Sequence, residues 1–199
     1  MSTVYLIVGP IGGGKSAVAD FILADGALKT LEYVGSDVYK SAFFNSHTNN
    51  TERSYRCADD LAFYRIEQIC KTGQDFMYEF CPTNPNKLET LKYLLRKYSY
   101  RVISFFVSTE NEEINLVRCA NRAQHGADGV PAEKIRNRYG QALSRALELT
   151  QFSNTIYFVD NSRDTPRLVA CITDDALSVA DDACDWFEKH VKHKLAYHD

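Results

Sequence analysis

The segment GPIGGGKS, residues 9–16, constrains the fold of this chain more than any other feature of its sequence. It follows the apolar run TVYLIV and precedes a helical pattern, so it lies where a strand passes into a helix. Gly9, Gly14, Lys15 and Ser16 satisfy the spacing G-x-x-x-x-G-K-[ST]. A tight turn could use glycine for its shape alone, but the motif and its context together predict a loop that binds phosphate groups.

The residue types in this segment suit a nucleoside triphosphate. Where glycine leaves no side chain in the way, several backbone N–H groups can converge on one phosphate. The helix that begins near Gly14 adds the positive end of its dipole. Lys15 is expected to reach the β- and γ-phosphates, and the Ser16 hydroxyl is expected to ligate Mg²⁺. ATP is the expected nucleotide, with GTP left open. The expected nucleotide-binding residues are Gly9, Pro10, Ile11, Gly12, Gly13, Gly14, Lys15, Ser16 and Ala17.

Composition narrows the class of protein further. The 199 residues are 45% hydrophobic and 25% charged, which is ordinary for a globular chain long enough for one domain. A net charge of -3 provides no overall basic field for nucleic acid. The apolar run at the start is too short to cross a bilayer, and the six cysteines form no CxxC pair. We expect a cytoplasmic protein that binds neither a membrane nor nucleic acid.

Short runs rich in β-branched and aromatic residues alternate with helical patterns, which is typical of a parallel sheet with crossover helices. The expected strands lie near 3–9, 31–35, 76–80, 101–107 and 155–160. The expected helices span 15–24, 57–72, 86–97, 110–124 and 131–149, and residues 45–54 are expected to form a mobile loop. A further strand and an amphipathic helix, with Trp186, Phe187 and Val191 in the core, are expected within 166–195. The sequence thus predicts an α/β fold with a five-stranded, mostly parallel sheet flanked by helices, in a single domain over residues 1–199.

Other motifs separate the classes of nucleotide chemistry. No aspartate is followed by a glycine three residues later, so the D-x-x-G motif of GTP-binding switches is missing. The segment NKLE at 86–89 imitates the guanine-reading N-K-x-D motif, but it follows the third strand too early and ends in Glu. A small-molecule kinase needs a phosphate cradle, an acceptor pocket, a base and an arginine-bearing lid, and this chain offers each of them.

Two carboxylates are expected beside the phosphate-binding loop. Asp37 lies just beyond the second strand, and the carboxyl ends of neighbouring parallel strands face one crevice. There it could take the proton of an acceptor hydroxyl, although the same residue could instead cap a helix that starts at Val38. Glu79 ends the run FMYEF and could hold a magnesium-bound water or an acceptor hydroxyl, or could serve only as a paired strand-end carboxylate.

Arginines flank the helix-breaking segment QHGADGVP, residues 124–131. Arg118 and Arg122 precede it at i and i+4, and Arg136 and Arg138 follow it. Fork-shaped cations on a hinged pair of helices can cover a transferring phosphate, so we expect a lid at about 118–145, with catalytic roles for Arg118, Arg122 and Arg138 and substrate binding by Arg136. Because Arg136 and Arg138 point about 200° apart, only one of them can face the site. Alternatively, these arginines are ordinary solvent-exposed charges on the two helices.

With these features in place, the chain resembles the zeta toxin family of P-loop kinases from about residue 3 to residue 190. The resemblance is most specific in RCANRAQHGADGVPAEKIRNRY and in IYFVDNS. It implies a phosphate-binding Lys15, a general base at Asp37, a strand-three carboxylate at Glu79 and lid arginines among the four named above. It also implies ATP-dependent phosphorylation of a hydroxyl on a small-molecule acceptor, which is a UDP-activated amino sugar in the best-known members, and an antitoxin protein as a partner.

The chain departs from the family pattern at the hinge. It has Gly126, Ala127 and Asp128 where small relatives often read Gly-Gly-His, and it has GQALSR after Tyr139 where a Pro-Arg-Ser type run is common. Two other classes therefore stay open. One is another small P-loop kinase that acts on a nucleoside, a nucleotide, an antibiotic or a nucleic-acid 5′-hydroxyl. The other is a nucleotide-binding interaction module without acceptor chemistry.

Overall fold

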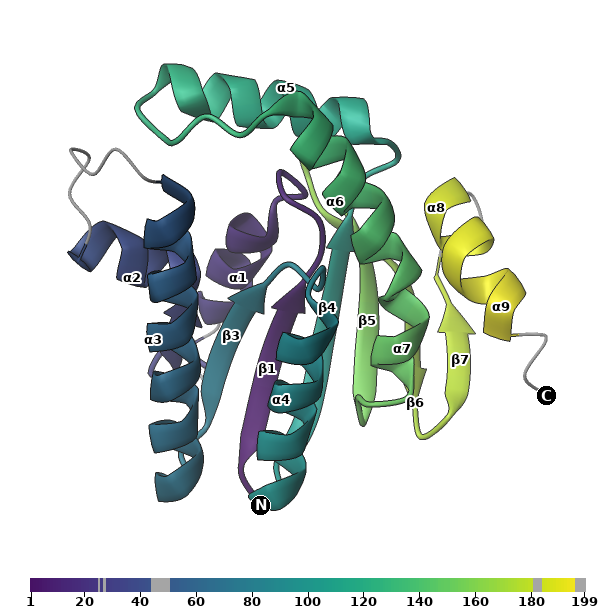
Figure 1. The fold of residues 1–199 in the computed structure, drawn as a ribbon. Coiled ribbons are helices and arrows are strands. Elements are labelled where there is room, and N and C mark those ends of the chain that lie inside the picture. The colour runs from purple at the N-terminus through teal and green to yellow at the C-terminus, as the bar shows by residue number, and fades with distance from the viewer. Residues whose placement is uncertain (25, 27, 44–50, 181–183, 196–199) are drawn as a thin grey trace.

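A computed structural model describes residues 1–24, 26, 28–43, 51–180 and 184–195. Its centre is one seven-stranded sheet in the order β2-β3-β1-β4-β5-β6-β7 (Figure 1). The strands are β1 (Thr3–Val8), β2 (Glu32–Gly35), β3 (Phe76–Phe80), β4 (Arg101–Ser108), β5 (Thr155–Asp160), β6 (Arg167–Thr173) and β7 (Ala176–Val179). β1 to β5 pair in parallel, whereas β6 and β7 are antiparallel. The expected α/β class is confirmed, but the count of five strands is wrong because the β6–β7 hairpin extends the sheet beyond β5.

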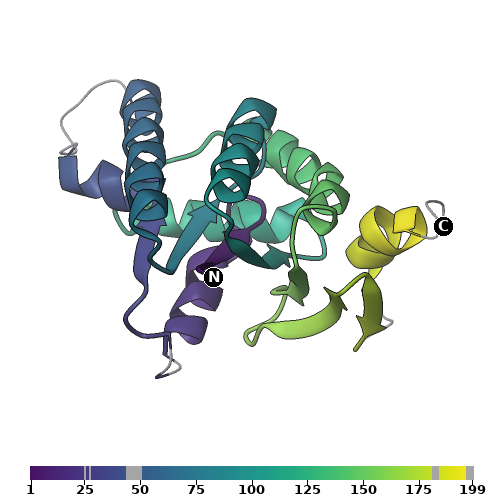
Figure 2. The same cartoon turned by 90° about the horizontal axis from the view of Figure 1, so that it is seen from below.

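Helices cover the two faces of the sheet unequally (Figure 2). They are α1 (Lys15–Leu23), α2 (Ser36–Phe43), α3 (Thr51–Thr72), α4 (Pro85–Lys97), α5 (Glu112–Gln124), α6 (Ala132–Ser144), α7 (Ala146–Thr150), α8 (Asp185–Phe187) and α9 (His193–Leu195), with the π-helical turn η1 (Glu188–Lys192) between α8 and α9. α1 packs on one face, while α3, α4, α6, α7 and the C-terminal helical segment pack on the other. In the described part of the chain, none of these helices is long and apolar enough to cross a membrane.

The alternation of side chains along β1 divides the core in two. Leu6 and Val8 belong to the larger cluster, which the helices on the α3 and α4 side complete. Ile7 points to the opposite face, where it packs with Val18 and Ala19 of α1. All five are buried, so β1 is apolar on both faces, as a central parallel strand requires.

The C-terminal segment is part of the larger cluster. Trp186, Phe187 and Val191 are buried, as expected from their helical spacing. The rings of Phe187 and Phe158 lie 4.9 Å apart between centroids, so this segment packs directly against β5. The β6–β7 hairpin and the helical segment after it thereby close the end of the sheet that five strands alone would leave open.

Two of the expected helices differ clearly from the observed ones. α3 begins at Thr51, so residues 51–54 of the expected loop are helical. Residues 45–50 of that loop lie outside the described residues. Ser54 is only 3% exposed, which shows that packing fixes this polar turn although its sequence lacks an apolar repeat. The single helix expected over 131–149 breaks at Arg145, which lets Ala146 and Leu149 enter the core.

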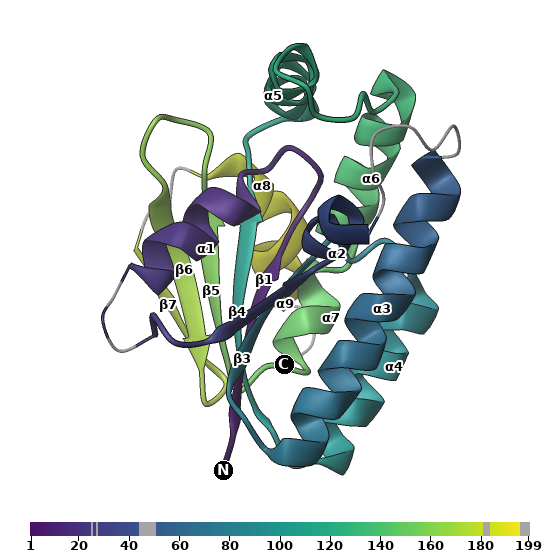
Figure 3. The same cartoon turned by 90° about the vertical axis from the view of Figure 1, so that its left-hand side faces the viewer.

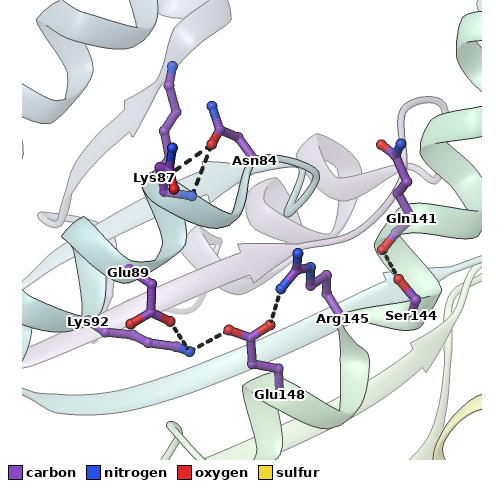
Figure 4. Close-up of polar contacts among 9 residues, drawn as sticks. Asn84, Lys87, Glu89, Lys92, Gln141, Ser144, Arg145 and Glu148 are labelled. Carbon is purple, nitrogen blue, oxygen red and sulfur yellow. Dashed lines mark hydrogen bonds and ion pairs between the residues drawn. The ribbon is translucent and has the colours of Figure 1, made fainter.

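A polar network ties α4 to α7 across the covered face (Figure 4). Lys92 is 8% exposed and donates to Glu89 at 2.8 Å and to Glu148. Arg145 donates to the other oxygen of Glu148 at 2.7 Å. Burial alone would raise the pKa of the Glu148 carboxyl, but the hydrogen bonds and charges of Lys92 and Arg145 outweigh it and hold this pKa below its usual range.

We predict that Glu148→Gln lowers the free energy of unfolding by about 2 kcal/mol at neutral pH, between the values of exposed and buried ion pairs. Because the pKa of Glu148 is lower in the folded than in the unfolded chain, this stabilisation is present above the unfolded-chain value and is lost as pH falls through the folded-state value. Urea denaturation of both proteins at about pH 7 and about pH 4 should show the difference shrinking. A constant difference would contradict the assignment.

Candidate functional site

Close approaches at both ends of the loop after β1 admit only glycine. A Cβ atom at Gly9 would lie 2.0 Å from the Val107 carbonyl oxygen of β4. A Cβ atom at Gly14 would lie 1.8 Å from Asn161 Nδ2, and Gly14 also has a φ of 87°, in the left-handed region. Backbone can therefore pass close to its neighbours at both ends of the loop.

Two buried asparagines brace this loop, and sequence reasoning had given neither a role. Asn115 of α5 donates from Nδ2 to the Ile11 carbonyl oxygen at 2.7 Å. Asn161, directly after β5, donates from Nδ2 to the Gly13 carbonyl oxygen at 3.0 Å. Asn161 lies within the DNS segment on which the family resemblance rests. Asn115 gave no signal, because one asparagine inside an amphipathic helix pattern looks like any polar position.

The brace at Asn115 continues into the helix pair above the sheet (Figure 1). Thr109 donates its hydroxyl to Asn115 Oδ1, and the carbonyl oxygen of Thr109 accepts from the Tyr139 hydroxyl at 2.6 Å. Tyr139 belongs to α6, so a chain of hydrogen bonds runs from α6 to the carbonyl of Ile11. Burial raises the pKa of the Tyr139 hydroxyl to about 12, which keeps it a donor.

Lys15, Ser16 and Glu79 meet beside the loop. Glu79 lies opposite Ile7 in the β1–β3 ladder, which brings its carboxylate to the start of α1. Ser16 Oγ donates to Glu79 Oε2 at 3.0 Å, and Lys15 Nζ lies 3.8 Å from Glu79 Oε1. Lys15 is only 9% exposed and also donates to the Pro10 carbonyl oxygen at 3.1 Å. The ammonium group is thus held at the loop rather than extended into solvent.

The oxygen donors at this position fit a magnesium ion that is held mainly by phosphate and water. Ser16 and Glu79 contribute a hydroxyl and a carboxylate within one hydrogen bond of each other. Within the described ranges, no group of three or more acidic, histidine or cysteine side chains could hold a metal on its own. Mg²⁺ usually keeps several waters and binds through one or two protein oxygens together with substrate phosphates. The donor set agrees with that use.

A tyrosine that sequence reasoning missed joins this group. Tyr33 of β2 donates its hydroxyl to Glu79 Oε2, the same oxygen that accepts from Ser16. Burial, and then the negative charge of Glu79, raise the pKa of Tyr33 well above its usual value, so the phenol keeps its proton. A single tyrosine in a predicted strand reads as a core residue, and only the pairing of β2 with β3 reveals its partner.

Asp37 and two of the predicted arginines, Arg122 and Arg138, act on one phenol, that of Tyr55. Asp37 lies in the first turn of α2, which begins at Ser36. Burial and the charge of Asp37 raise the pKa of Tyr55, while the charges of Arg122 and Arg138 lower it. Charges carried by α2, α5 and α6 therefore all act on Tyr55 of α3.

The charge of Arg138 also acts on a second group, the Cys81 thiol. Burial raises the pKa of the Cys81 thiol, whereas the positive charges of Lys15 and Arg138 lower it. Cys81 follows β3 directly, so the guanidinium of Arg138 and the ammonium of Lys15 both act at the carboxyl end of that strand. Arg138 of α6 therefore influences both Tyr55 of α3 and the thiol at the end of β3.

The other two predicted arginines have different surroundings. Arg118 Nη1 lies 3.7 Å from the position that a Cβ atom of Gly14 would take, and this buried nitrogen has no hydrogen-bond partner among the described residues. Arg136 instead pairs with Glu113 of α5 at 3.0 Å, and both side chains are about half exposed or more, at 49% and 65%. The structure thus brings Arg118 to the loop and places Arg136 in an exposed ion pair outside the group around Tyr55.

Asp128, the residue that departs from the family pattern, contacts α2 and α3. It pairs with Lys40 of α2 and accepts from the Tyr55 hydroxyl at 3.2 Å. Lys40 Nζ also lies 4.5 Å from the centroid of the Tyr55 ring. The loop between α5 and α6 reaches out over the start of α3, as Figures 1 and 3 show from two sides. Asp128, Lys40 and Tyr55 thus join the α5–α6 loop to α2 and α3, and these contacts are here called the Asp128 bridge.

No protein-family model matches this chain, and no curated protein matches it in sequence. Solved structures do share its architecture. A chain from the AvrRxo1-ORF1:AvrRxo1-ORF2 complex with ATP has a TM-score of 0.73 at 16% identity, over 96% of this chain and 63% of that one. A chain from the PezAT chromosomal toxin-antitoxin system of Streptococcus pneumoniae has a TM-score of 0.69 at 14% identity, over 100% of this chain and 84% of that one.

A sugar kinase from Janibacter sp. is also similar, with a TM-score of 0.53 and 14% identity over 80% of this chain and 86% of that one. This chain spans 63% of the length of the AvrRxo1 complex chain, so that protein carries segments with no counterpart here. At these identities the likeness is one of fold. The expected resemblance to zeta toxin-like P-loop kinases is confirmed at that level, and the chain has the P-loop kinase fold.

Proposed function

We propose that this protein is an ATP-dependent kinase that transfers the γ-phosphoryl group to a hydroxyl of a small metabolite. The observation that carries the proposal is the phosphate loop with Lys15, Ser16 and Glu79 in contact beside it. Asp37, Arg122 and Arg138, whose charges all act on Tyr55, would supply a base and stabilisation of developing negative charge. Structures of similar fold include one with ATP and one sugar kinase, which supports the same assignment.

Nucleotide binding would use the loop and its braces. Lys15 would move its ammonium from the Pro10 carbonyl to the β- and γ-phosphates, while backbone N–H groups of residues 11–14 would line the phosphates. Ser16 and Glu79 would hold Mg²⁺, which neutralises phosphate charge when it is bound. The buried Nη1 of Arg118 beside Gly14 is an unused donor at the same loop and would bind a phosphate oxygen.

Transfer would then take place between the loop and Asp37. The acceptor oxygen forms a bond to the γ-phosphorus while the bond from that phosphorus to the β–γ bridging oxygen breaks, and ADP leaves with the electron pair. Asp37 accepts the proton of the acceptor hydroxyl and later releases it to water. Arg122 and Arg138 would stabilise the charge on the transferring group, since both act on Tyr55, as Asp37 does, and Arg138 also acts on Cys81, as Lys15 does.

We further propose that residues 118–145 form a lid within a single domain over 1–199. The family resemblance makes a UDP-activated amino sugar the first acceptor to test and an antitoxin protein a partner to seek; the PezAT toxin-antitoxin system is among the proteins of similar fold. Incubation of the purified protein with γ-labelled ATP and a metabolite extract, followed by identification of the labelled product by mass, would separate this acceptor from nucleosides, nucleotides and antibiotics.

We predict that Asp37→Asn lowers the rate of phosphoryl transfer by about 10²- to 10⁴-fold, the usual contribution of a general base, and leaves ATP affinity nearly unchanged. Lys15→Ala should weaken both ATP binding and transfer, because the ammonium contacts the phosphates themselves. Calorimetric titration with ATP and a transfer assay would measure the two effects separately. Asp60→Asn, at an exposed position of α3, is the matched control.

These variants also separate the competing classes of protein. Wild-type transfer by Asp37→Asn would show that another group is the base. Nucleotide turnover that is unaffected by Asp37→Asn, with no labelled acceptor in any extract, would indicate an interaction module without acceptor chemistry. Failure of the wild-type protein to bind any nucleoside triphosphate in the presence of Mg²⁺ would contradict the proposal altogether.

We predict that Arg138→Ala lowers kcat/KM by about 10²- to 10³-fold, as expected for one donor to a transition-state anion. Arg136→Ala should change it less than about threefold, because exposed ion pairs contribute little. The two residues lie on one helix and lose the same side chain, so Arg136→Ala controls for the loss of charge and helix stability. Steady-state kinetics of both variants would measure the contrast, and equal losses would show that α6 presents another face to the substrate.

A further inference from the structure

Tyr33 belongs to β2, and packing holds its side chain in place. Its ring packs in the smaller hydrophobic cluster with Ile7 and Val18. The ring also passes beside Gly35, where a Cβ atom would lie 3.5 Å from it. From this half-buried position, its hydroxyl reaches across to β3 and donates to Glu79 Oε2. The ring is anchored by packing, so the hydroxyl is presented to the carboxylate from a fixed direction.

Ser16, Lys15 and Tyr33 all contact the Glu79 carboxylate, but they differ in whether they belong to the phosphate loop. Ser16 and Lys15 both belong to the motif that binds a nucleotide and its metal. When phosphates bind, Lys15 turns to them and the Ser16 hydroxyl turns to the metal. Of the three, Tyr33 alone lies outside the phosphate loop and has no nucleotide-binding role. The carboxylate therefore keeps its hydrogen bond to Tyr33 at the step in which its other contacts are given up.

We propose that Tyr33 is a positioning residue that holds the Glu79 carboxylate toward the metal position while Lys15 and Ser16 engage the nucleotide. Without the phenol hydroxyl, Glu79 would be free to follow the Lys15 ammonium and to compete with the phosphates for it. The hydroxyl thus favours the magnesium–nucleotide complex over the nucleotide alone. This inference rests on the proposed function, but it concerns equilibrium binding and needs no acceptor.

The test compares binding of a non-hydrolysable ATP analogue with and without Mg²⁺, by calorimetry on the full chain. Tyr33→Phe should raise the dissociation constant of the magnesium complex by about tenfold, the effect of losing one hydrogen bond to a charged group. Its affinity for the analogue without Mg²⁺ should stay within about twofold of wild type, since the loop itself is unchanged. Tyr5→Phe, which removes a hydroxyl from a half-buried tyrosine of the same cluster, should leave both constants unchanged.

A double-mutant cycle decides whether Tyr33 acts through Glu79. In a Glu79→Ala background, Tyr33→Phe should have almost no further effect, because the carboxylate that it positions is gone. Additive effects of the two substitutions, an equal loss of affinity with and without Mg²⁺, or no effect of Tyr33→Phe would each overturn the inference. Thermal melts of every variant show whether a loss reflects unfolding. If wild type binds the analogue and Tyr33→Phe behaves like it, the inference fails while the proposed function stands.

Discussion

Parallel pairing of β1 with β3 and β4 is the constraint on which the rest of the structure depends. The ladder sets Ile7 opposite Glu79 on one side and opposite Phe105 on the other. It also brings Gly9 so close to the Val107 carbonyl that no side chain fits between them. The phosphate loop and the carboxylate beside it are thus positioned by backbone hydrogen bonds in the centre of a sheet that is buried on both faces. Functional groups held in this way are preorganised, because the strands that carry them cannot shift independently.

Around that centre, each functional side chain is supported by a neighbour from another element. Asn161 and Asn115 hold loop carbonyls from β5 and α5, and Tyr33 holds Glu79 from β2. The Tyr139 hydroxyl extends the same support into α6. These contacts join parts of the chain far apart in sequence, so the site is assembled only when the whole sheet has formed. Such supporting groups commonly matter for function nearly as much as the groups that touch a ligand.

Patterns that repeat or that punctuate the chain were predictable from sequence, whereas long-range polar contacts were not. The positions of β1 to β5 followed from buried apolar runs, and the phosphate loop followed from its glycines and Lys15. The strand β7 is only four residues long and mostly exposed, and it forms because β6 offers an edge to pair with. Tyr33 and Asn115 were missed for a related reason, since a tyrosine in a strand and an asparagine in a helix gain their roles only through partners elsewhere in the chain. The division of Arg136 from Arg138 was foreseeable in principle from helix geometry, but only Glu113 shows which of the two turns outward.

The strength of the Asp128 bridge depends on the ionic strength of the medium. Lys40 and Asp128 have side chains that are 18% and 36% exposed, so mobile ions in solution screen their attraction. Separation of the α5–α6 loop from α2 therefore costs less free energy as ionic strength rises. A neutral histidine at residue 128 would give the loop no such dependence. The acid found there makes the attachment of this loop to α2 depend on the salt content of the medium.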